Sequence, residues 1–408
     1  MKYQFTADAD SKSYDAFVST HPLSTLLQSY KWSNIKQNWG SVHTAVLDEQ
    51  GNMAGAALML IKRLPGGFSM CYIPRGPIMD YHNQELVKFY MDELKKEAKK
   101  HKALFIKMDP PVHLNDYASA DYNQNWYPEA KEVISNLEKA GCIHQGYTVM
   151  IEESIQPRFQ SVVYDQENFD DTLPKHTKRL IKDADKRNVQ IIHGHKELLD
   201  DFSRLVQLTE ERKGVALRNR DYFELLLDTY GEDAVIFLAV CDVHQLLKDA
   251  KAKMTQLEAE KAATPENAKK KLRRIEDQIN STAKSVKEFQ EMADQGIEEG
   301  QNAIAGILSV NYGKTCEMLY AGMDERFKQF MPQYKEYVEN FKWAFEKGCT
   351  MASMGGVEGT LDDGLTKFKD NFAPTINEFI GEFDIPVNKI LYAPAKAAYN
   401  KMKERING

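Results

Sequence analysis

The chain has 408 residues, of which 42% are hydrophobic and 28% charged, and its formal net charge at pH 7 is −7. This length and hydrophobic content predict two or three packed domains and exclude an intrinsically disordered chain. The acidic balance excludes a protein whose whole surface binds nucleic acid, although local basic patches are compatible with it.

The sequence shows no sign of export and no metal-binding pattern. Residues 1–17 contain no apolar run, and no stretch of the chain reaches the roughly eighteen consecutive apolar residues that suggest a membrane span. The five cysteines lie far apart, form no CxxC pair and have no histidine at metal-ligand spacing. We therefore expect a cytoplasmic protein with reduced, buried cysteines, no metal and no cofactor.

The first part of the chain alternates strand and helix patterns. The predicted elements are a short strand and a helix within 3–17, an amphipathic helix over 21–40, two antiparallel strands within 42–64, a strand over 67–81 that Pro74 and Pro77 interrupt, a helix over 83–101, a strand over 103–111 and a helix over 128–140. This alternation predicts an α/β fold with mixed sheets flanked by helices.

Two polar residues in this part are candidates for function. Lys36 follows the apolar face of the helix over 21–40, and from the residues alone it is most simply a surface lysine. Asp109 follows a strand that Pro110 and Pro111 end, so its carboxylate lies at the mouth of the sheet. It fits a base or a substrate contact, but capping the next turn is the more usual role of a single Asp before Pro.

Strand and helix patterns begin again after Gly141, which predicts a domain junction near residue 145. The predicted elements are a strand over 143–163, a basic helix over 175–187, two helices within 201–231, a strand over 234–241, a β-hairpin within 303–323, a helix over 327–347, and a strand-like segment and a helix after residue 379.

Residues 242–300 differ in character, because they are rich in Ala, Lys and Glu and have apolar residues at intervals of three or four. The pattern predicts two helices that fold back on each other around Pro265. The flanking segments read as neighbouring strands, so we expect this helical hairpin to be an arm inserted between them.

Two basic clusters stand out in this acidic chain. They lie on the helix over 175–187 and near the tip of the arm, and their cations are Lys175, Lys178, Arg179 and Lys182, and Lys269, Lys270, Lys271, Arg273 and Arg274. A solvated helix face is the usual meaning of such a run. Both clusters also fit contacts with phosphates, and the arm fits an RNA backbone or a protein partner equally well.

Residues 351–372 combine glycines with a lysine between aromatic residues. The glycines precede a short amphipathic segment that carries Phe368, Lys369 and Phe372. Glycines let a ligand approach the main chain, and packing can aim the ammonium group of a lysine. A loop followed by a helix with a solvated lysine explains the same residues, and isolated glycine motifs often have no function.

Together, these features resemble the Fem (FemABX) non-ribosomal peptidyltransferases, bacterial enzymes that use aminoacyl-tRNA to build the interpeptide bridge or branch of peptidoglycan. The resemblance covers nearly the whole chain. It rests on the order of the segments YIPRGPI, RLIKDADKRNV, RNRDYF, LYAGMDERF, GGVEG…DGLTKFKDNF and EFIGEFD, and on the position of the arm.

The resemblance implies two subdomains, each similar to a GNAT N-acetyltransferase sheet, and a function. The expected subdomains are 1–145, and 146–241 with 301–408, and the expected coiled-coil arm is 242–300. The implied reaction transfers an amino acid from aminoacyl-tRNA to an amine of a peptidoglycan precursor, either lipid II or a UDP-muropeptide. A lipid-linked acceptor implies transient peripheral contact with the inner face of the membrane, and DNA is not an expected partner.

The resemblance also implies roles for residues at matching positions, with the two basic clusters as tRNA contacts. The implied acceptor contacts are Lys36, Arg218 and Tyr222, with Tyr320 lining the cleft. The implied catalytic residues are Phe368 and Lys369, where the tRNA acceptor end meets the nucleophile, with Asp109 near the family's cleft carboxylate.

The implied chemistry is aminolysis of an ester, in which the acceptor amine attacks the aminoacyl carbonyl and a ribose oxygen leaves. An ester is already activated, so the absence of a Ser-His or Cys-His arrangement is consistent with this reaction. The ammonium of Lys369 can stabilise the developing negative charge. The proton acceptor stays open between Asp109 and a group of the tRNA.

Two other functions fit parts of the sequence. An acetyl-CoA-dependent N-acyltransferase of the same fold needs a Q/RxxGxG/A loop for the pyrophosphate, and PRGP at 74–77 has only one glycine. A non-catalytic RNA-binding or partner-binding protein would act through its arm.

Overall fold

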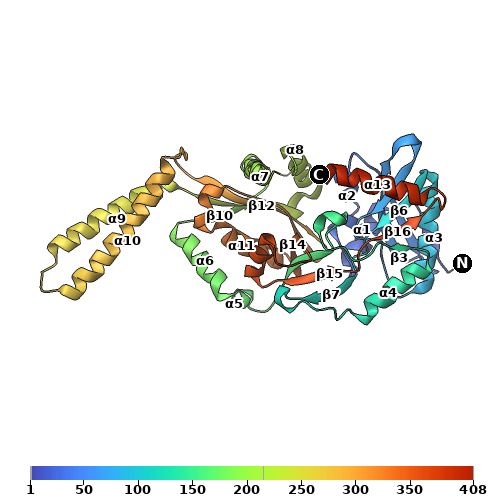
Figure 1. Ribbon diagram of the computed structural model, residues 1–408, viewed down its shortest axis with the longest axis horizontal. Coiled ribbons are helices and arrows are strands. Elements are labelled where there is room, and N and C mark those ends of the chain that lie inside the picture. Colours follow the sequence, from blue (N-terminus) through green and yellow to red (C-terminus); the bar gives the residue numbers. More distant parts are fainter. Residues whose placement is uncertain (1, 215, 408) are drawn as a thin grey trace.

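The protein contains two eight-stranded mixed sheets with helices packed against them, and a two-helix arm that projects from one side (Figure 1). The computed structural model describes residues 2–214 and 216–407. The predicted α/β fold with mixed sheets is confirmed.

The first sheet has the strand order β1-β2-β3-β4-β6-β16-β8, and β5 pairs with β3. Its strands are β1 (Gln4–Thr6), β2 (Gly40–Leu47), β3 (Met53–Arg63), β4 (Ser69–Ile73), β5 (Ile78–Met79), β6 (Ala103–Met108), β8 (Ile143–His144) and β16 (Phe383–Pro386). Strands β4 and β6 run parallel, and the other pairs of described strands are antiparallel.

The second sheet has the strand order β10-β11-β12-β13-β14-β9-β15-β7. Its strands are β7 (His113–Tyr117), β9 (Phe159–Tyr164), β10 (Gln190–Gly194), β11 (Ala234–Cys241), β12 (Asn302–Tyr312), β13 (Thr315–Met323), β14 (Met351–Val357) and β15 (Thr375–Phe379). Strands β13 and β14 form its parallel pair, and this pairing covers only three residues of each strand.

Along the chain, the helices alternate with the strands, and in space several of them pack against the two sheets. They are α1 (Ser11–Thr20), α2 (Trp32–Ile35), α3 (Gln84–Lys100), α4 (Pro128–Lys139), α5 (Phe169–Thr172), α6 (Lys175–Lys186), α7 (Leu199–Lys213), α8 (Arg220–Tyr230), α9 (Val243–Ala263), α10 (Lys269–Ala293), α11 (Pro332–Glu346), α12 (Gly364–Lys369) and α13 (Tyr392–Asn407).

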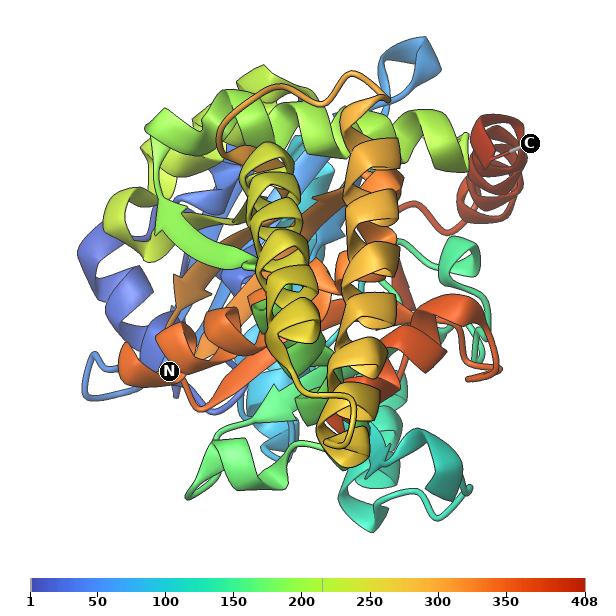
Figure 2. The same cartoon turned by 90° about the vertical axis from the view of Figure 1, so that its left-hand side faces the viewer.

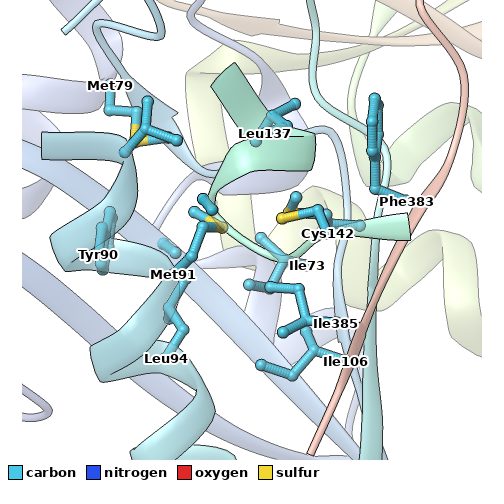
Figure 3. Close-up of a cluster of buried hydrophobic side chains, with 14 of the residues drawn as sticks. Ile73, Met79, Tyr90, Met91, Leu94, Ile106, Leu137, Cys142, Phe383 and Ile385 are labelled. Carbon is cyan, nitrogen blue, oxygen red and sulfur yellow. The ribbon is translucent and has the colours of Figure 1, made fainter. Parts of the chain in front are cut away.

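One hydrophobic core lies between the first sheet and helices α3 and α4 (Figure 3). The side chain of Asn83 caps α3 by accepting an amide hydrogen of its first turn. The helix then buries Tyr90 and Leu94, four residues apart, on the face that meets the sheet. Phe383 and Ile385 of β16 pack in the same core although they come from the far end of the chain.

A buried ion network attaches β16 to β6. The Nζ atom of Lys107 donates to Oδ1 of Asp384 at 2.8 Å and to Oε2 of Glu382 at 3.0 Å. Burial alone would lower the pKa of Lys107, but the two carboxylates raise it above its usual value. Removal of one partner from such a buried network leaves an uncompensated charge, so loss of either carboxylate or of Lys107 would destabilise the attachment of β16.

The arm consists of α9 and α10, which turn back on each other after Ala263 and bury Leu257 and Ile275. It connects β11 to β12, and these strands pair antiparallel from Ala234/Val310 to Cys241/Asn302. The arm is therefore an insertion between two adjacent strands of the second sheet.

The predicted helix over 21–40 is wrong. The segment instead forms a 3₁₀ turn (Leu26–Gln28) and the four-residue helix α2, with Ser29 extended between them. The reason is tertiary, because the buried side chain of Gln28 donates to the carbonyl oxygen of Pro74 at 2.6 Å and accepts the amide hydrogen of Leu58 at 2.8 Å.

The predicted strand over 143–163 is wrong in its middle. Strand β8 ends at His144 and β9 begins at Phe159, with a loop between them in which Gly146 has a φ of +88°. Tyr147 and Val149 are exposed in this loop, so their alternation does not mark a buried face.

The predicted helix over 327–347 is broken near its start. A 3₁₀ segment (Glu325–Phe330) comes first, and Met331, with a φ of +55°, separates it from α11. Pro332 is the first residue of α11, where its missing amide hydrogen costs nothing.

Two strands cross the expected subdomain limits. Strand β7, within 1–145, pairs with β15 in the second sheet, and β16, near the C-terminus, pairs with β6 in the first. A single division at residue 145 therefore does not separate the sheets, and we propose subdomains that exchange one strand in each direction.

Candidate functional site

A cleft lies between the two halves of the molecule, where the parallel strands β13 and β14 diverge. Their pairing stops at Glu317 and Ser353, although β13 continues to Met323. The space between them belongs to a cavity of about 710 Å³. Residues 22–25, before α2, and residues 111–113, at the start of β7, line the same cavity.

Lys369 lies directly behind the wall that β14 contributes to this cleft. Its Nζ atom donates to the carbonyl oxygens of Gly356 at 2.8 Å and Gly355 at 3.2 Å, and both glycines line the cleft. Lys369 is 3% exposed, and burial lowers its pKa to about 7, although Asp363 opposes this effect. These two bonds use two hydrogens of the Nζ atom. The charged ammonium form has a third hydrogen, which it can donate to another acceptor.

The glycines beside Lys369, Gly355 and Gly356, lie in strand β14 rather than in a loop. Strand β14 has an irregular register with β9 between Ser353 and Gly356. Gly355 has a φ of +79°, and a Cβ atom at Gly356 would lie 2.4 Å from the ring of Pro157. Gly355 is needed for its backbone conformation, and Gly356 is needed because Pro157 packs closely against it. The sequence gives no sign of this packing contact.

Phe368, next to Lys369 in the sequence, lies on a different side of α12. Its ring makes edge contacts with Tyr337 at 5.3 Å and Tyr334 at 5.5 Å between centroids. Phe368 and Tyr334 line a separate pocket of about 560 Å³ that Arg326 also borders. Of the expected pair, Phe368 therefore lines this separate pocket, and Lys369 lies behind the wall of the main cleft.

The four expected acceptor-binding residues lie together in and beside a third pocket. Lys36, Arg218 and Tyr222 line a pocket of about 510 Å³ between α2 and α8. The guanidinium of Arg218 lies 5.1 Å from the Tyr222 ring centroid, and Tyr320 makes an edge contact with Tyr222 at 5.9 Å. Burial, followed by repulsion from Arg218, lowers the pKa of Lys36 to about 8. Two cations this close favour an anion between them.

Asp109, expected near the cleft carboxylate, is 2% exposed and does not line the cleft. Its Oδ1 atom accepts the amide hydrogen of Arg75 at 2.9 Å, and Arg75 has a φ of +45°. Burial raises the pKa of Asp109 to about 7, although Arg75 opposes this effect. Asp109 thus positions Arg75, whose guanidinium lines the cleft 3.9 Å from the ring centroid of Phe379.

The carboxylate that does line the cleft is Glu317, which the sequence reasoning missed. It is half-buried at the last paired position of β13, opposite Ser353. Burial raises the pKa of Glu317 to about 7, and a hydrogen bond from Ser353 and the charge of Arg75 oppose this effect. In the sequence, the one feature that points to a role for Glu317 is its position shortly before Leu319 and Tyr320 in the predicted hairpin.

The first basic cluster lies on α6, which is attached to the segment that follows Lys369. The hydroxyl of Thr177 donates to the carbonyl oxygen of Asn371. Arg187, just after α6, pairs with Glu288 of the arm at 3.4 Å. Helix α6 lies on the side of the body from which the arm projects (Figure 1). The second cluster begins α10 at the far tip of the arm, where Lys271 pairs with Glu260 at 3.2 Å.

The remaining expectations concern cysteines, metals and membrane spans. All five cysteines are free and buried, as predicted. Within residues 2–214 and 216–407, no group of three or more His, Cys, Asp or Glu side chains is arranged to hold a metal ion. In the same described part of the chain, no helix combines the length and apolar character that crossing a membrane requires.

Comparison with known proteins assigns the family. The FemAB family model matches residues 10–400. The chain belongs to the FemAB family. Lipid II:glycine glycyltransferases of Staphylococcus aureus, from strains bovine RF122 / ET3-1 and USA300, are each 30% identical over 405 residues, which covers 94% of this chain and 93% of the relative. A crystal structure of FemX matches with a TM-score of 0.76 and 27% identity, covering 96% of this chain and 99% of that one.

The depressed pKa of Lys369 predicts a pH-dependent contribution to the stability of this FemAB protein. The unfolded chain binds the proton up to about pH 10.5 and the folded protein only up to about pH 7. Between these values, deprotonation favours folding, so the free energy of unfolding of the wild type should rise relative to Lys369→Met, by up to about 1.4 kcal/mol per pH unit. Urea unfolding at about pH 7.5 and 9 measures this difference.

The matched control is Lys367→Met, because Lys367 is exposed on the same helix. We expect its effect on stability to be the same at both pH values. An equal pH dependence in the two variants would contradict a specific effect of burial at Lys369.

Proposed function

We propose that this protein is an aminoacyltransferase that moves an amino acid from aminoacyl-tRNA to an amine of a peptidoglycan precursor. The observation that carries the proposal is the match to lipid II:glycine glycyltransferases over nearly the whole of both chains. The enzyme class, a transferase, follows from this family. The tRNA donor, the acceptor contacts and peripheral contact with the inner face of the membrane are finer parts of the proposal.

The acceptor would be held through its diphosphate by Lys36 and Arg218. A guanidinium binds phosphate oxygens in two-point fashion, and a half-buried ammonium beside it adds a second positive charge. Leu319 lines the main cleft and Tyr320, its neighbour on β13, packs on Tyr222 of this pocket. A precursor with its diphosphate between α2 and α8 would then extend its peptide toward the cleft that Leu319 lines.

The donor tRNA would approach from the side of α6 and the arm. The cations of α6 that the sequence singled out form no ion pair with a carboxylate in the described part of the chain, so they are available to phosphates. Phe368 and Tyr334 offer a ring-lined pocket beside Lys369, and aromatic side chains stack on unpaired bases. The aminoacyl end would then reach the cleft at Gly355 and Gly356.

The reaction itself needs proton transfer and charge stabilisation. The acceptor ammonium gives a proton to the carboxylate of Glu317, and the free amine attacks the ester carbonyl. The tetrahedral oxyanion collapses to the amide, the ribose oxygen leaves and takes up the proton that the attacking nitrogen loses, and Glu317 returns its own proton to water. Lys369, protonated, stabilises negative charge through the wall formed by Gly355 and Gly356.

A panel of substrates tests the proposed function. Purified protein should transfer an amino acid from charged tRNA to a lipid-linked or nucleotide-linked muropeptide, with product formation followed by mass spectrometry. Failure with a full set of charged tRNAs and both acceptors would overturn the proposal. Transfer from acetyl-CoA in its place would favour the N-acyltransferase alternative, and tRNA binding without any transfer would favour a non-catalytic RNA-binding protein.

Substitutions in the two pockets should separate binding from catalysis. Arg218→Gln is expected to raise the KM for the acceptor about tenfold or more with little change in kcat, because it removes a phosphate contact present throughout the reaction. Lys369→Met is expected to lower kcat by about 10²–10³-fold, because it removes stabilisation of the developing charge. Steady-state kinetics distinguishes the two effects.

The control for these substitutions is Arg220→Gln, since Arg220 is exposed nearby and already pairs with Asp200 and Glu224. Its kinetic constants should match those of the wild type. Equal losses in Arg218→Gln and Arg220→Gln would contradict a specific anion site at Arg218.

The pH profile tests the proton acceptor. Glu317 must be ionised and Lys369 must be protonated, and both pKa values lie at about 7. The kcat/KM of the wild type should therefore pass through a maximum near neutral pH. Glu317→Gln should lower activity and remove the rise on the acidic side, because the carboxylate that titrates there is gone. An unchanged acidic limb would exclude Glu317 and point to a tRNA group as the acceptor.

A further inference from the structure

One end of the first sheet gathers segments that are distant in the sequence. The β3–β4 turn (residues 64–68) emerges there, and the amide of Ser69 donates to the carbonyl oxygen of Lys102 at 3.1 Å. The end of α3 leads into β6 at the same place. After β16, the amide of Asn388 donates to the carbonyl oxygen of Leu104 at 3.0 Å, which brings residues 388–391 to this end as well.

We name residues 62–68, 99–102 and 388–391 the basic end of the first sheet. These segments contain no Asp or Glu in a chain of net charge −7. Their cations are Lys62, Arg63, Lys99, Lys100, Lys102 and Lys389. Lys100 pairs with Glu97, which is nearly buried, and the others have no carboxylate within ion-pair distance in the described part of the chain. The basic end is therefore strongly positive.

Apolar side chains protrude among these cations. Ile390 is 87% exposed and Phe68 is 39% exposed, although both are large apolar residues that normally avoid water. Helix α13 continues this surface, because it packs on the body through Tyr392 and Tyr399 and leaves Ala393, Ala397 and Ala398 exposed. Figure 1 shows the β3–β4 turn (blue) and α13 (red) at one corner, and the arm at the opposite end of the molecule.

The basic end adjoins the pocket that carries the expected diphosphate contacts. The Nζ atom of Lys62 lies 5.5 Å from the ring centroid of Trp39, and Trp39 lines the pocket together with Lys36 and Arg218. Strand β2 begins after Trp39 and pairs Gly40 with Ile61, so the pocket opens at the same end of the sheet. A lipid attached to a diphosphate in this pocket would leave the protein beside Phe68 and Lys62.

We propose that the basic end of the first sheet docks on the surface of an anionic lipid bilayer, with Phe68 and Ile390 inserted at the boundary between headgroups and acyl chains. The inference rests on the proposed function in one respect, the lipid-linked acceptor. Charge complementarity favours this partner, since clustered Lys and Arg residues are attracted to anionic headgroups. An aliphatic side chain such as Ile390 gains by entering a bilayer and offers nothing for stacking to a nucleic acid.

Docking would orient the whole molecule. With the basic end on the membrane, the arm lies at the opposite end of the molecule (Figure 1), the end that faces the viewer in Figure 2. A soluble tRNA can then approach from the aqueous side while the acceptor reaches its pocket from the bilayer. The two substrates would meet in the cleft without passing each other.

Co-sedimentation with vesicles tests the proposal. The full-length protein should bind vesicles of phosphatidylcholine with about 30% phosphatidylglycerol, should bind pure phosphatidylcholine weakly, and should lose binding at high salt. The variant Lys99→Glu/Lys102→Glu/Lys389→Glu should bind the anionic vesicles more weakly by on the order of a hundredfold. The variant Phe68→Ser/Ile390→Ser should also bind the anionic vesicles more weakly. The size of this loss should depend less on the salt concentration than the loss in the charge-reversal variant.

The matched control is Lys12→Glu/Lys131→Glu/Lys139→Glu, which makes the same change in net charge at exposed lysines of α1 and α4. It should bind like the wild type. Loss of binding in both triple variants to the same extent, or no binding of the wild type, would overturn the proposal. If the first triple variant keeps vesicle binding and instead loses affinity for tRNA in a gel-shift assay, the basic end is an RNA surface and the proposal is wrong.

Failure of this proposal and failure of the proposed function are distinguishable. The charge-reversal variant should transfer as well as the wild type to a nucleotide-linked acceptor without vesicles, because its three sites lie outside the pockets. It should transfer more slowly to lipid-linked acceptor in vesicles. Transfer by a wild type that binds no vesicles would sink only the docking proposal, whereas vesicle binding without any transfer would sink only the proposed function.

Discussion

The divergence of the parallel strands β13 and β14 is the constraint on which the rest of the site depends. Their hydrogen bonding stops at Glu317 and Ser353, so the second sheet opens at this point and leaves a cleft. The backbone that lines it needs partners other than a neighbouring strand. Lys369 supplies two of the missing hydrogen bonds from behind, and Glu317 borders the cleft from the opposite strand. Both side chains lose hydration there, which moves their pKa values toward neutrality from opposite directions.

The second constraint is the exchange of strands between the sheets. Strand β16 closes the first sheet through the Lys107 network, and β7 extends the second. The chain between β15 and β16 is short, so the two sheets are held next to each other at Phe379 and Phe383. Arg75, fixed by Asp109 of the first half, contacts Phe379 of the second. The cleft thus lies between parts that are tied together on one side, which favours a stable geometry of the cleft.

Three surfaces of the molecule differ in the kinds of side chain that they expose. The basic end of the first sheet combines cations with protruding apolar side chains, the pocket between α2 and α8 combines two cations with aromatic rings, and α6 and the tip of the arm carry clusters of exposed cations. Cations with apolar residues suit a bilayer, cations in a pocket suit a diphosphate, and cations on an exposed helix suit a nucleic-acid backbone. Their order along the molecule is the one that the proposed transfer requires, with the cations of α6 and the arm far from the basic end.

The sequence by itself determined the α/β class, the arm between neighbouring strands and most regular elements, because helix caps, periodicity and turn residues act within a few positions of each other. It also grouped Lys36, Arg218, Tyr222 and Tyr320 through resemblance to a family, and the structure brings these four side chains together. Only the tertiary structure decided the break at Gln28, the exchange of β7 and β16, the burial of Lys369 and the place of Glu317 in the cleft. Each of these depends on contacts between residues far apart in the chain, such as Gln28 with Pro74 and Glu317 with Ser353, and local patterns carry no information about such contacts.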